Sequence, residues 1–143
     1  MKRLSDVNVL VTLVSNRSRQ HALTKAWWER LPPTESLCIC RHVQTSLLRL
    51  LCTETVMGGE TMTLPQAWNV YAQLLASGRF TFTVEPPGLD VTWAGFCRPF
   101  GRSPKVVMDA YLAAFAVAGG YRLVTLDQAF GQFKGLVWEC PLV

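Results

Sequence analysis

Histidines, paired cysteine motifs and glycine-rich loops are scarce or missing in this sequence, and each shortage argues against one class of site. His21 and His42 are the only histidines, and no serine or cysteine stands in a nucleophile motif, so we do not expect a catalytic triad. The five cysteines include no CxxC pair and lie mostly in apolar segments, which favours reduced, buried thiols over disulfides or zinc ligands. There is no glycine-rich phosphate loop, because Gly58 and Gly59 only mark a turn.

Long apolar runs and a secretion signal are missing too. No segment approaches the roughly 18 consecutive apolar residues of a membrane span. The chain begins with the basic residues Lys2 and Arg3, but Asp6 and Asn8 interrupt the apolar stretch that follows, and no small-residue cleavage site comes after it. We therefore expect a soluble, cytoplasmic protein.

The remaining composition fits one compact domain over residues 1–143. Half of the residues are apolar and 17% are charged, and a chain of this length can bury roughly 70% of the surface that it exposes when unfolded. The net charge of +4 and the pI near 9.0 favour partners with negative charge, nucleic acid among them. Many ordinary soluble proteins carry a surplus of this size, so it carries little weight alone.

Strand-like and helix-like segments alternate along the chain, which predicts an α/β fold with a central parallel sheet flanked by helices. The expected strands are Lys2–Asp6, Leu37–Cys40, Phe80–Val84, Tyr121–Leu126 and Leu136–Glu139. The expected helices are His21–Leu31, Val43–Cys52, Pro65–Ala76, Val91–Phe96, and one from Ser103 as N-cap and Pro104 as first residue to Gly119 and Gly120 just beyond its end. Val7–Val14 fits a strand or a helix. We favour the helix, because Asn8 is a good N-cap.

Three aspartates fall where such a fold would bring them together. Asp6 and Asp127 each follow a strand, Asp109 lies in a helix that must pack beside them, and ligands collect beyond the carboxyl ends of parallel strands. Grouped carboxylates repel one another, so they are either partly protonated or hold a hard cation such as Mg²⁺. The plainer alternative is that an aspartate after a strand is a turn or N-cap residue. We favour the cation, and with it phosphodiester hydrolysis by metal-activated water.

Several segments, spread in order over nearly the whole chain, carry a family resemblance. They are SDVNVLVTL at Ser5–Leu13, the HALTKAWWERL helix, VQTSLLRLL at Val43–Leu51, EPPGLD at Glu85–Asp90, MDAYLAAFAVAGGYRLVTLDQAF at Met108–Phe130, and FKGL at Phe133–Leu136. Together they resemble a PIN-domain ribonuclease of the VapC toxin type. The DxN after the first strand and the DAYLAA helix followed by LVTxD are specific in combination.

This resemblance implies a three-layer α/β/α fold and an endoribonuclease that depends on Mg²⁺ or Mn²⁺. Such toxins usually form homodimers, and a cognate VapB-type antitoxin silences them by occupying the active-site groove. The family's acids fall on Asp6, Asp109 and Asp127, while Asn8 and Thr125 match polar residues that support the site.

The second acidic position departs from the family pattern. Where the family usually has a glutamate before the helix arginine, this chain has Gln44, and the arginine is present as Arg49. An amide oxygen has similar reach but carries no charge, so we expect weaker metal binding while keeping Gln44 in the site. The rival hypothesis is therefore a catalytically weak PIN-like module that binds RNA or antitoxin without hydrolysis.

Aromatic and basic residues outside these motifs leave two readings open. The tryptophans on expected helices are Trp27, Trp28 and Trp68. We expect them either to form core or dimer contacts or to stack on RNA bases. The basic residues on the expected loops are Arg17, Arg19, Arg41, Arg102 and Lys105. We expect them either to bind phosphates or to form part of a solvated surface. We expect His21 to cap a helix, and Cys38 and Cys40 to share a buried face of one strand.

Overall fold

The computed structural model describes residues 1–143 and contains one sheet of five parallel strands in the order β3-β2-β1-β4-β5. The strands are β1 Arg3–Ser5, β2 Leu37–Ile39, β3 Phe80–Phe82, β4 Arg122–Val124 and β5 Trp138–Glu139. Each lies within a segment that the sequence predicts as a strand. The predicted α/β fold with a central parallel sheet is therefore confirmed.

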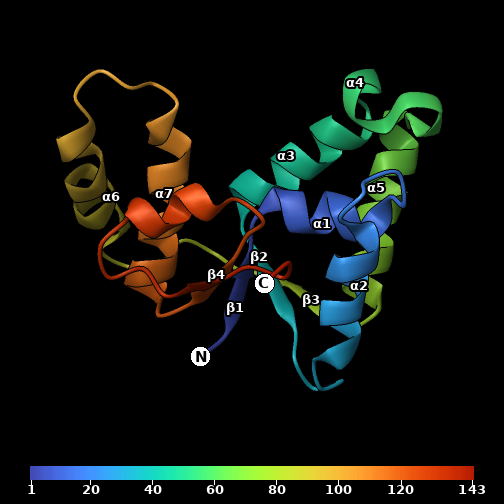
Figure 1. Ribbon diagram of the computed structural model, residues 1–143, viewed down its shortest axis with the longest axis horizontal. Coiled ribbons are helices and arrows are strands. Elements are labelled where there is room, and N and C mark those ends of the chain that lie inside the picture. Colours follow the sequence, from blue (N-terminus) through green and yellow to red (C-terminus); the bar gives the residue numbers. More distant parts are fainter.

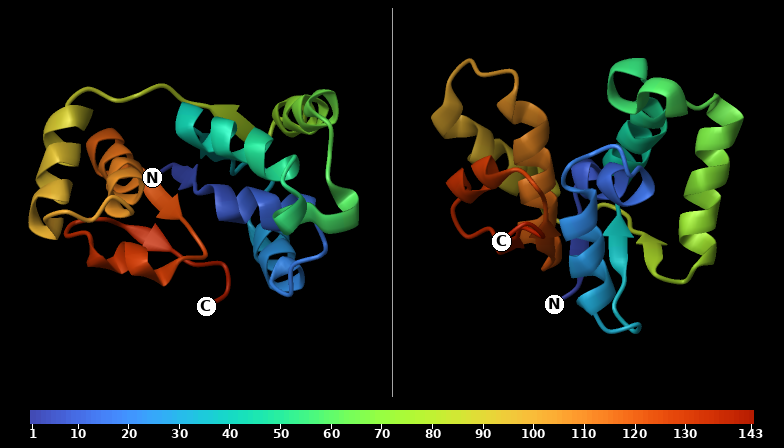
Figure 2. Two further views of the ribbon diagram at one scale, coloured as in Figure 1. Left: turned by 90° about the horizontal axis from the view of Figure 1, so that it is seen from above. Right: turned by 45° about the vertical axis from the view of Figure 1, so that its right-hand side comes forward.

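Seven α-helices flank this sheet. They are α1 Val7–Val14, α2 His21–Arg30, α3 Arg41–Leu51, α4 Glu54–Met57, α5 Leu64–Ala76, α6 Leu89–Cys97 and α7 Val106–Gly119, with short 3₁₀ helices η1 Gly58–Glu60, η2 Arg98–Phe100 and η3 Gln128–Gln132. Helices α6 and α7 lie on one side of the sheet, and α1, α2, α3 and α5 lie on the other (Figures 1 and 2). This is the layered arrangement that the sequence predicts.

The strand order determines where the acids can meet. Strands β1 and β4 are hydrogen-bonded neighbours at the centre of the sheet, with Leu4 paired to Leu123 and both fully buried. Helix α7 packs on this centre through a surface of small, fully buried residues, namely Ala110, Ala113, Ala114 and Ala116. Small side chains allow the helix backbone to approach closely, so a residue on α7 can lie beside the ends of β1 and β4.

Helix α1 begins earlier than the sequence predicts. Its N-cap is Asp6, whose Oδ1 accepts a hydrogen bond from Val7 N at 2.7 Å, so the prediction of Asn8 as N-cap is wrong. Asn8 is the second residue of the helix. Strand β1 ends at Ser5 and the chain turns into α1 within one residue, which leaves the capping position to Asp6.

Other helix starts also differ from the prediction. Ser103 and Pro104 form a turn before α7, and the helix starts only at Val106 with Lys105 as N-cap, so the predicted Ser103 cap is wrong. The other end agrees, because Gly120 caps α7 in the left-handed conformation at φ 72°. His21 does not cap α2; its Nδ1 lies 2.7 Å from Thr12 O and links α2 to α1.

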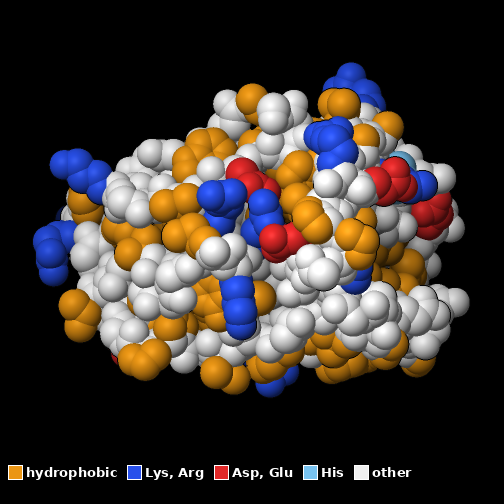
Figure 3. All heavy atoms as spheres, turned by 90° about the horizontal axis from the view of Figure 1, so that it is seen from below, with side chains coloured by type: hydrophobic (Ala, Val, Ile, Leu, Met, Phe, Trp, Pro, Cys, Tyr) orange, Lys and Arg blue, Asp and Glu red, His pale blue; other side chains and the backbone are white.

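A small group of paired charges lies near the edge of the sheet at which β1 and β4 begin. Arg3 binds Glu35 and Glu139 at 3.1 and 2.9 Å, and Arg122 binds Glu139 at 3.2 Å. Figure 3 shows acidic and basic side chains next to one another on this face. Carboxylates here are neutralised by arginines, in contrast to those at the opposite, carboxyl edge of the sheet.

No helix combines the length and the hydropathy needed to span a bilayer.

Candidate active site

Asp6 lies at the carboxyl end of β1 with both carboxylate oxygens hydrogen-bonded. Oδ1 accepts from Val7 N at 2.7 Å, and Oδ2 accepts from the hydroxyl of Thr125 at 2.7 Å. Asp6 N also donates to Val124 O at 2.9 Å, which continues the pairing of β1 with β4. These bonds fix the direction of the carboxylate, and each oxygen keeps a further lone pair for another ligand.

Thr125 is the centre of this hydrogen-bond network. Its side chain is fully buried, and besides donating to Asp6 its Oγ1 accepts from Asp127 N at 3.1 Å and from Asn8 Nδ2 at 3.4 Å. Asn8 in turn accepts from Leu126 N through Oδ1 at 3.2 Å. Asn8 and Thr125 thus hold the start of α1 against the segment that follows β4.

Asp127 and Asp109 approach Asp6 from two other elements. Asp127 caps η3 by accepting from Ala129 N at 2.9 Å, and Asp109 lies in the first turn of α7. Burial raises the pKa of Asp6, and the negative charges of Asp109 and Asp127 raise it further against the lowering effect of its hydrogen bonds from Thr125 and Val7. Burial also raises the pKa of Asp109, with a further contribution from Asp127. The three carboxylates therefore lie within electrostatic reach of one another.

No lysine, arginine or histidine lies within 4 Å of any of these three carboxylates, since every ion pair in the protein involves a glutamate. A divalent cation would supply the missing positive charge and reverse the upward pKa shifts, so this all-oxygen donor set fits Mg²⁺ or Mn²⁺. No three acidic, histidine or cysteine side chains stand close enough to enclose an ion among themselves. One or two direct carboxylates, with water as the remaining ligands, would be enough for Mg²⁺.

Comparisons with known proteins agree with this geometry. The family model of the PIN domain matches residues 4–136, and the chain is 39% identical to Ribonuclease VapC41 of Mycobacterium tuberculosis over 93% of its length and 94% of the relative's. The chain belongs to the VapC type of the PIN-domain family. The family resemblance in the sequence is therefore confirmed.

Solved structures share the fold of this PIN domain at low sequence identity. The structure titled VapBC2 from Rickettsia felis bound to a DNA fragment from their promoter has a TM-score of 0.73 at 15% identity and covers 98% of both chains. Mycobacterium tuberculosis VapC20, described as a sarcin-ricin loop cleaving toxin, has a TM-score of 0.68 at 17% identity and covers 95% of this chain and 97% of its own.

Gln44 and Arg49, which the sequence analysis adds to the site, lie elsewhere on α3. The Gln44 side chain is buried, and its Oε1 accepts from Arg41 at 2.6 Å and forms no hydrogen bond with the three aspartates. Gln44 and Arg49 both line a groove between α3 and α5 that includes Leu64. Hydrogen bonds join Asp6, Asn8, Thr125 and the backbone of Asp127, and Asp109 lies within electrostatic reach of Asp6 and Asp127. The roles of these residues and of Gln44 in a metal site stay predictions.

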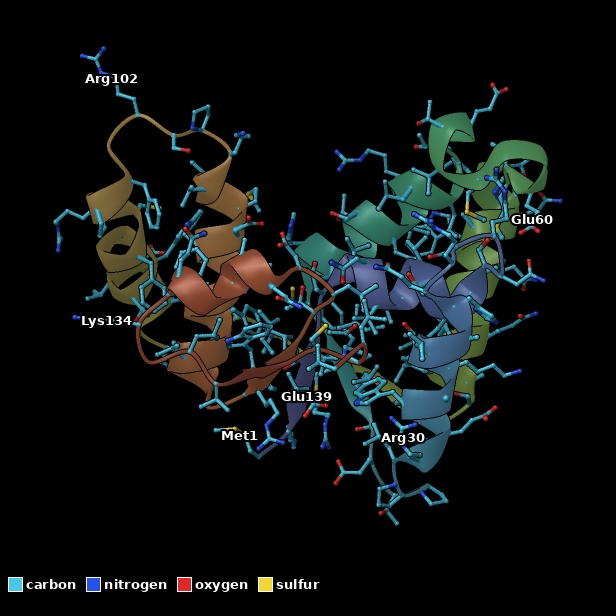
Figure 4. All side chains as sticks on the ribbon, viewed as in Figure 1. Met1, Arg30, Glu60, Arg102, Lys134 and Glu139 are labelled. Carbon is cyan, nitrogen blue, oxygen red and sulfur yellow. The ribbon has the colours of Figure 1, made fainter.

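The basic candidates also separate. Arg17 lines a cavity together with Asn8 and Asp127. Arg41 is engaged with Gln44 and lies 4.5 Å over the ring of Phe82. Arg102 projects from the tip of the α6–α7 connection, away from the rest of the protein (Figure 4). Of these three arginines, Arg17 shares a cavity with Asp127, whereas Arg41 shares its groove with Gln44.

The tryptophans divide between core and surface. Trp27 is buried in the core, and the ring of Trp28 lies 5.0 Å from that of Phe80, with Arg79 3.9 Å over its face. Trp68 is 51% exposed on α5, beside Tyr71. The first two are core contacts, as one of the two sequence readings expects.

Cys40 lies nearer to the site than its sequence context suggests. It is fully buried at the carboxyl end of β2, as N-cap residue of α3, and the charge of Asp6 contributes to raising its pKa after the larger effect of burial. The sequence predicts only core packing for this residue. Cys40 directly follows β2, just as Asp6 directly follows β1. This shared position at the carboxyl ends of parallel strands is the sequence signal that places Cys40 beside the site.

Proposed function

We propose that this chain is a divalent-metal-dependent endoribonuclease, the toxin of a type II toxin-antitoxin pair. The observation that carries the proposal is the group of carboxylates from Asp6, Asp109 and Asp127, which interact electrostatically and have no cationic partner in the chain. The relationship to a ribonuclease at 39% identity supports RNA as the substrate. An RNA substrate places the reaction in the cytoplasm.

In this proposal, Asp6, Asp109 and Asp127 hold Mg²⁺ or Mn²⁺, directly or through water. When bound, the cation would offset charge on the scissile phosphate and make hydroxide available from water near neutral pH. Hydrolysis then forms one bond from the water oxygen to phosphorus and breaks one phosphorus–oxygen bond of the backbone, without a covalent enzyme intermediate. Thr125 and Asn8 keep the Asp6 carboxylate in one orientation through the hydrogen bonds described above.

The proposed partners follow from the family. A VapB-type antitoxin would silence the enzyme by covering the active-site groove, and the toxin would form a homodimer. The fold shared with VapBC complexes supports the first of these.

A cleavage assay with the purified chain, freed of antitoxin, tests this function. We expect structured RNA to be cut when Mg²⁺ or Mn²⁺ is added and to remain intact in EDTA. Asp109→Asn should abolish cleavage and relieve growth arrest on expression. Asp90→Asn, at an exposed aspartate on α6, is the matched control and should stay active. Cleavage that persists in EDTA, or in Asp109→Asn, would contradict the proposal.

The alternative of an RNA- or antitoxin-binding module without hydrolysis is not favoured. It depends on Gln44, and the relationship to a ribonuclease favours catalysis. In the same assay, the alternative predicts RNA binding by the wild-type chain with no cleavage at any divalent-ion concentration.

A further inference from the structure

A cavity runs beside α1 from the candidate active site to the loop between α1 and α2. We propose that it is a nucleotide subsite, in which Arg17 binds a backbone phosphate next to the one that is cleaved. The inference rests on the proposed function, because the cavity shares Asn8 and Asp127 with the candidate active site.

The cavity has the size and lining of a nucleotide site. Its volume is about 650 Å³, within the usual range for small-molecule sites. Half-buried apolar side chains line part of it and offer a surface for a base; they are Val7, Val11, Leu50, Val56 and Leu126. Asn8, Asp127 and Arg17 provide polar groups around this apolar part. Apolar floor and polar rim together match a base with its phosphate.

Arg17 is held in place but keeps most of its hydrogen-bonding capacity. Its NH1 donates to Val56 O at 2.9 Å, and its backbone N donates to Ser15 Oγ at 3.3 Å. No carboxylate lies within 4 Å of its guanidinium, since it takes part in none of the ion pairs. A guanidinium has five N–H donors, so several remain for an anion. The anionic groups of RNA are its backbone phosphates, which a planar guanidinium can bind through two parallel hydrogen bonds.

Gly58 makes room for this arginine. Its backbone has φ +54°, and a Cβ added there would lie 2.5 Å from Arg17 Cζ. Any larger residue at position 58 would therefore strain the backbone and displace the guanidinium. The positive φ and the nearby guanidinium both favour glycine where α4 ends.

The distance along α1 separates the roles of the two ends. Asp6 caps one end of this helix and Arg17 lies three residues beyond the other, and a helix of eight residues is about 12 Å long. Arg17 and Asp6 therefore extend from opposite ends of α1, although the cavity connects the Arg17 end with Asp127. Arg17 binds a neighbouring phosphate of the same strand, and the base between the two phosphates packs on the apolar side chains of the cavity.

The kinetic test compares Arg17→Gln with Arg30→Gln, which removes the same charge at the far end of α2 (Figure 4). Arg17→Gln should raise KM for a short single-stranded RNA about tenfold, the loss expected for one charge-assisted hydrogen-bonded contact, with kcat within twofold. The slope of log affinity against log salt should fall by about 0.7, the contribution of one phosphate in a single strand. Arg17→Lys should restore the slope. A lowered kcat with unchanged KM and salt slope would overturn the proposal.

A binding test separates failure of the subsite from failure of the proposed function. In methyl-labelled Asp109→Asn protein, adding a dinucleotide RNA should shift the NMR resonances of Val11, Val56 and Leu126, and leave the exposed Val91 on α6 unchanged. When the protein carries Arg17→Gln as a second substitution, its affinity for the dinucleotide should be about tenfold lower. If wild-type protein never cleaves RNA and these shifts still appear, the subsite stands and the function falls. If RNA is cleaved and the shifts do not appear, the subsite falls.

Discussion

The hydroxyl of Thr125 donates to Asp6 Oδ2 at 2.7 Å, which ties the end of β4 to the end of β1 across a sequence separation of 119 residues. The same oxygen accepts from Asp127 N and Asn8 Nδ2. One buried hydroxyl thus orients the first aspartate, the segment that carries another, and the start of α1.

Replacing this hydroxyl by a methyl group should disorganise the site without emptying the core. We expect Thr125→Val to lower divalent-ion affinity and RNA cleavage by about 10 to 100-fold, as for other residues that orient metal ligands. Stability should fall by about 1–3 kcal/mol, because Asp6, Asp127 N and Asn8 lose a buried partner. Thr125→Ser keeps the hydroxyl and serves as the control. Urea unfolding and a metal titration of both variants check this, and full activity in Thr125→Val would count against the network.

The raised pKa values of Asp6 and Asp109 predict how stability depends on pH without metal. A carboxyl group whose pKa lies higher in the folded state binds more protons there than in the unfolded state. In EDTA, the contribution of these groups should therefore be greatest below the unfolded pKa near 4 and be lost as pH rises through the raised folded values.

Asp109→Asn and divalent ions should each offset that loss of stability. Above the raised pKa, Asp109→Asn should increase the melting temperature in EDTA by a few degrees, because it removes a negative charge next to Asp127. Mg²⁺ at 100 times its Kd should stabilise the wild-type protein by about 2.7 kcal/mol and the variant by less. Calorimetry at several pH values measures both effects. A variant that is destabilised in EDTA would refute the repulsion.

Gln44→Glu tests the one position that departs from the family pattern. A carboxylate would pair with Arg41, which already donates to Gln44, so part of the new charge would be neutralised. We therefore expect divalent binding to tighten only a few-fold, through a longer-range charge interaction. Unchanged affinity would place Gln44 outside the coordination sphere, and calorimetric titration with Mn²⁺ distinguishes the two results.

The thiols should be reduced and unequal in reactivity. Cys38 and Cys40 are buried with pKa values raised by burial, whereas Cys52, Cys97 and Cys140 are half-buried, and all five cysteines are free. Because thiolate is the reactive form, a thiol reagent at neutral pH should label at most three cysteines in native protein and all five in urea. Labelling of Cys40 before unfolding would contradict its burial beside the site.

The sequence predicts those parts of the fold that depend on local patterns. Apolar runs bounded by turn residues locate each of the five strands, and the aspartates after the first and fourth strands appear where parallel strands end. Cap positions are harder to predict. At the start of α1, Asp6 and Asn8 can each cap the helix, and the exit direction of β1 decides between them. Before α7, Ser103 lies in a turn and Lys105 takes the N-cap position without a side-chain cap bond.

The surroundings of the site depend on contacts that no local pattern encodes. Gln44 is an exception, because it bonds to Arg41 three residues earlier on the same helix. Arg17 acquires its position from Val56 and Gly58, which are about 40 residues away in sequence. Short helix α4, which carries that contact, is also missing from the sequence prediction, because four residues are too few for helical periodicity to show.

Asp6, Asp109 and Asp127 should together bind a divalent cation, and a Mn²⁺ titration followed by electron paramagnetic resonance measures this binding. We expect saturable binding to the wild-type chain and to Asp90→Asn, and binding weakened at least tenfold in each of Asp6→Asn, Asp109→Asn and Asp127→Asn, since each removes one charged oxygen ligand or its water-mediated equivalent. Equal Mn²⁺ affinity in the wild-type chain and in the variant with all three aspartates replaced would show that these residues do not form the cation site.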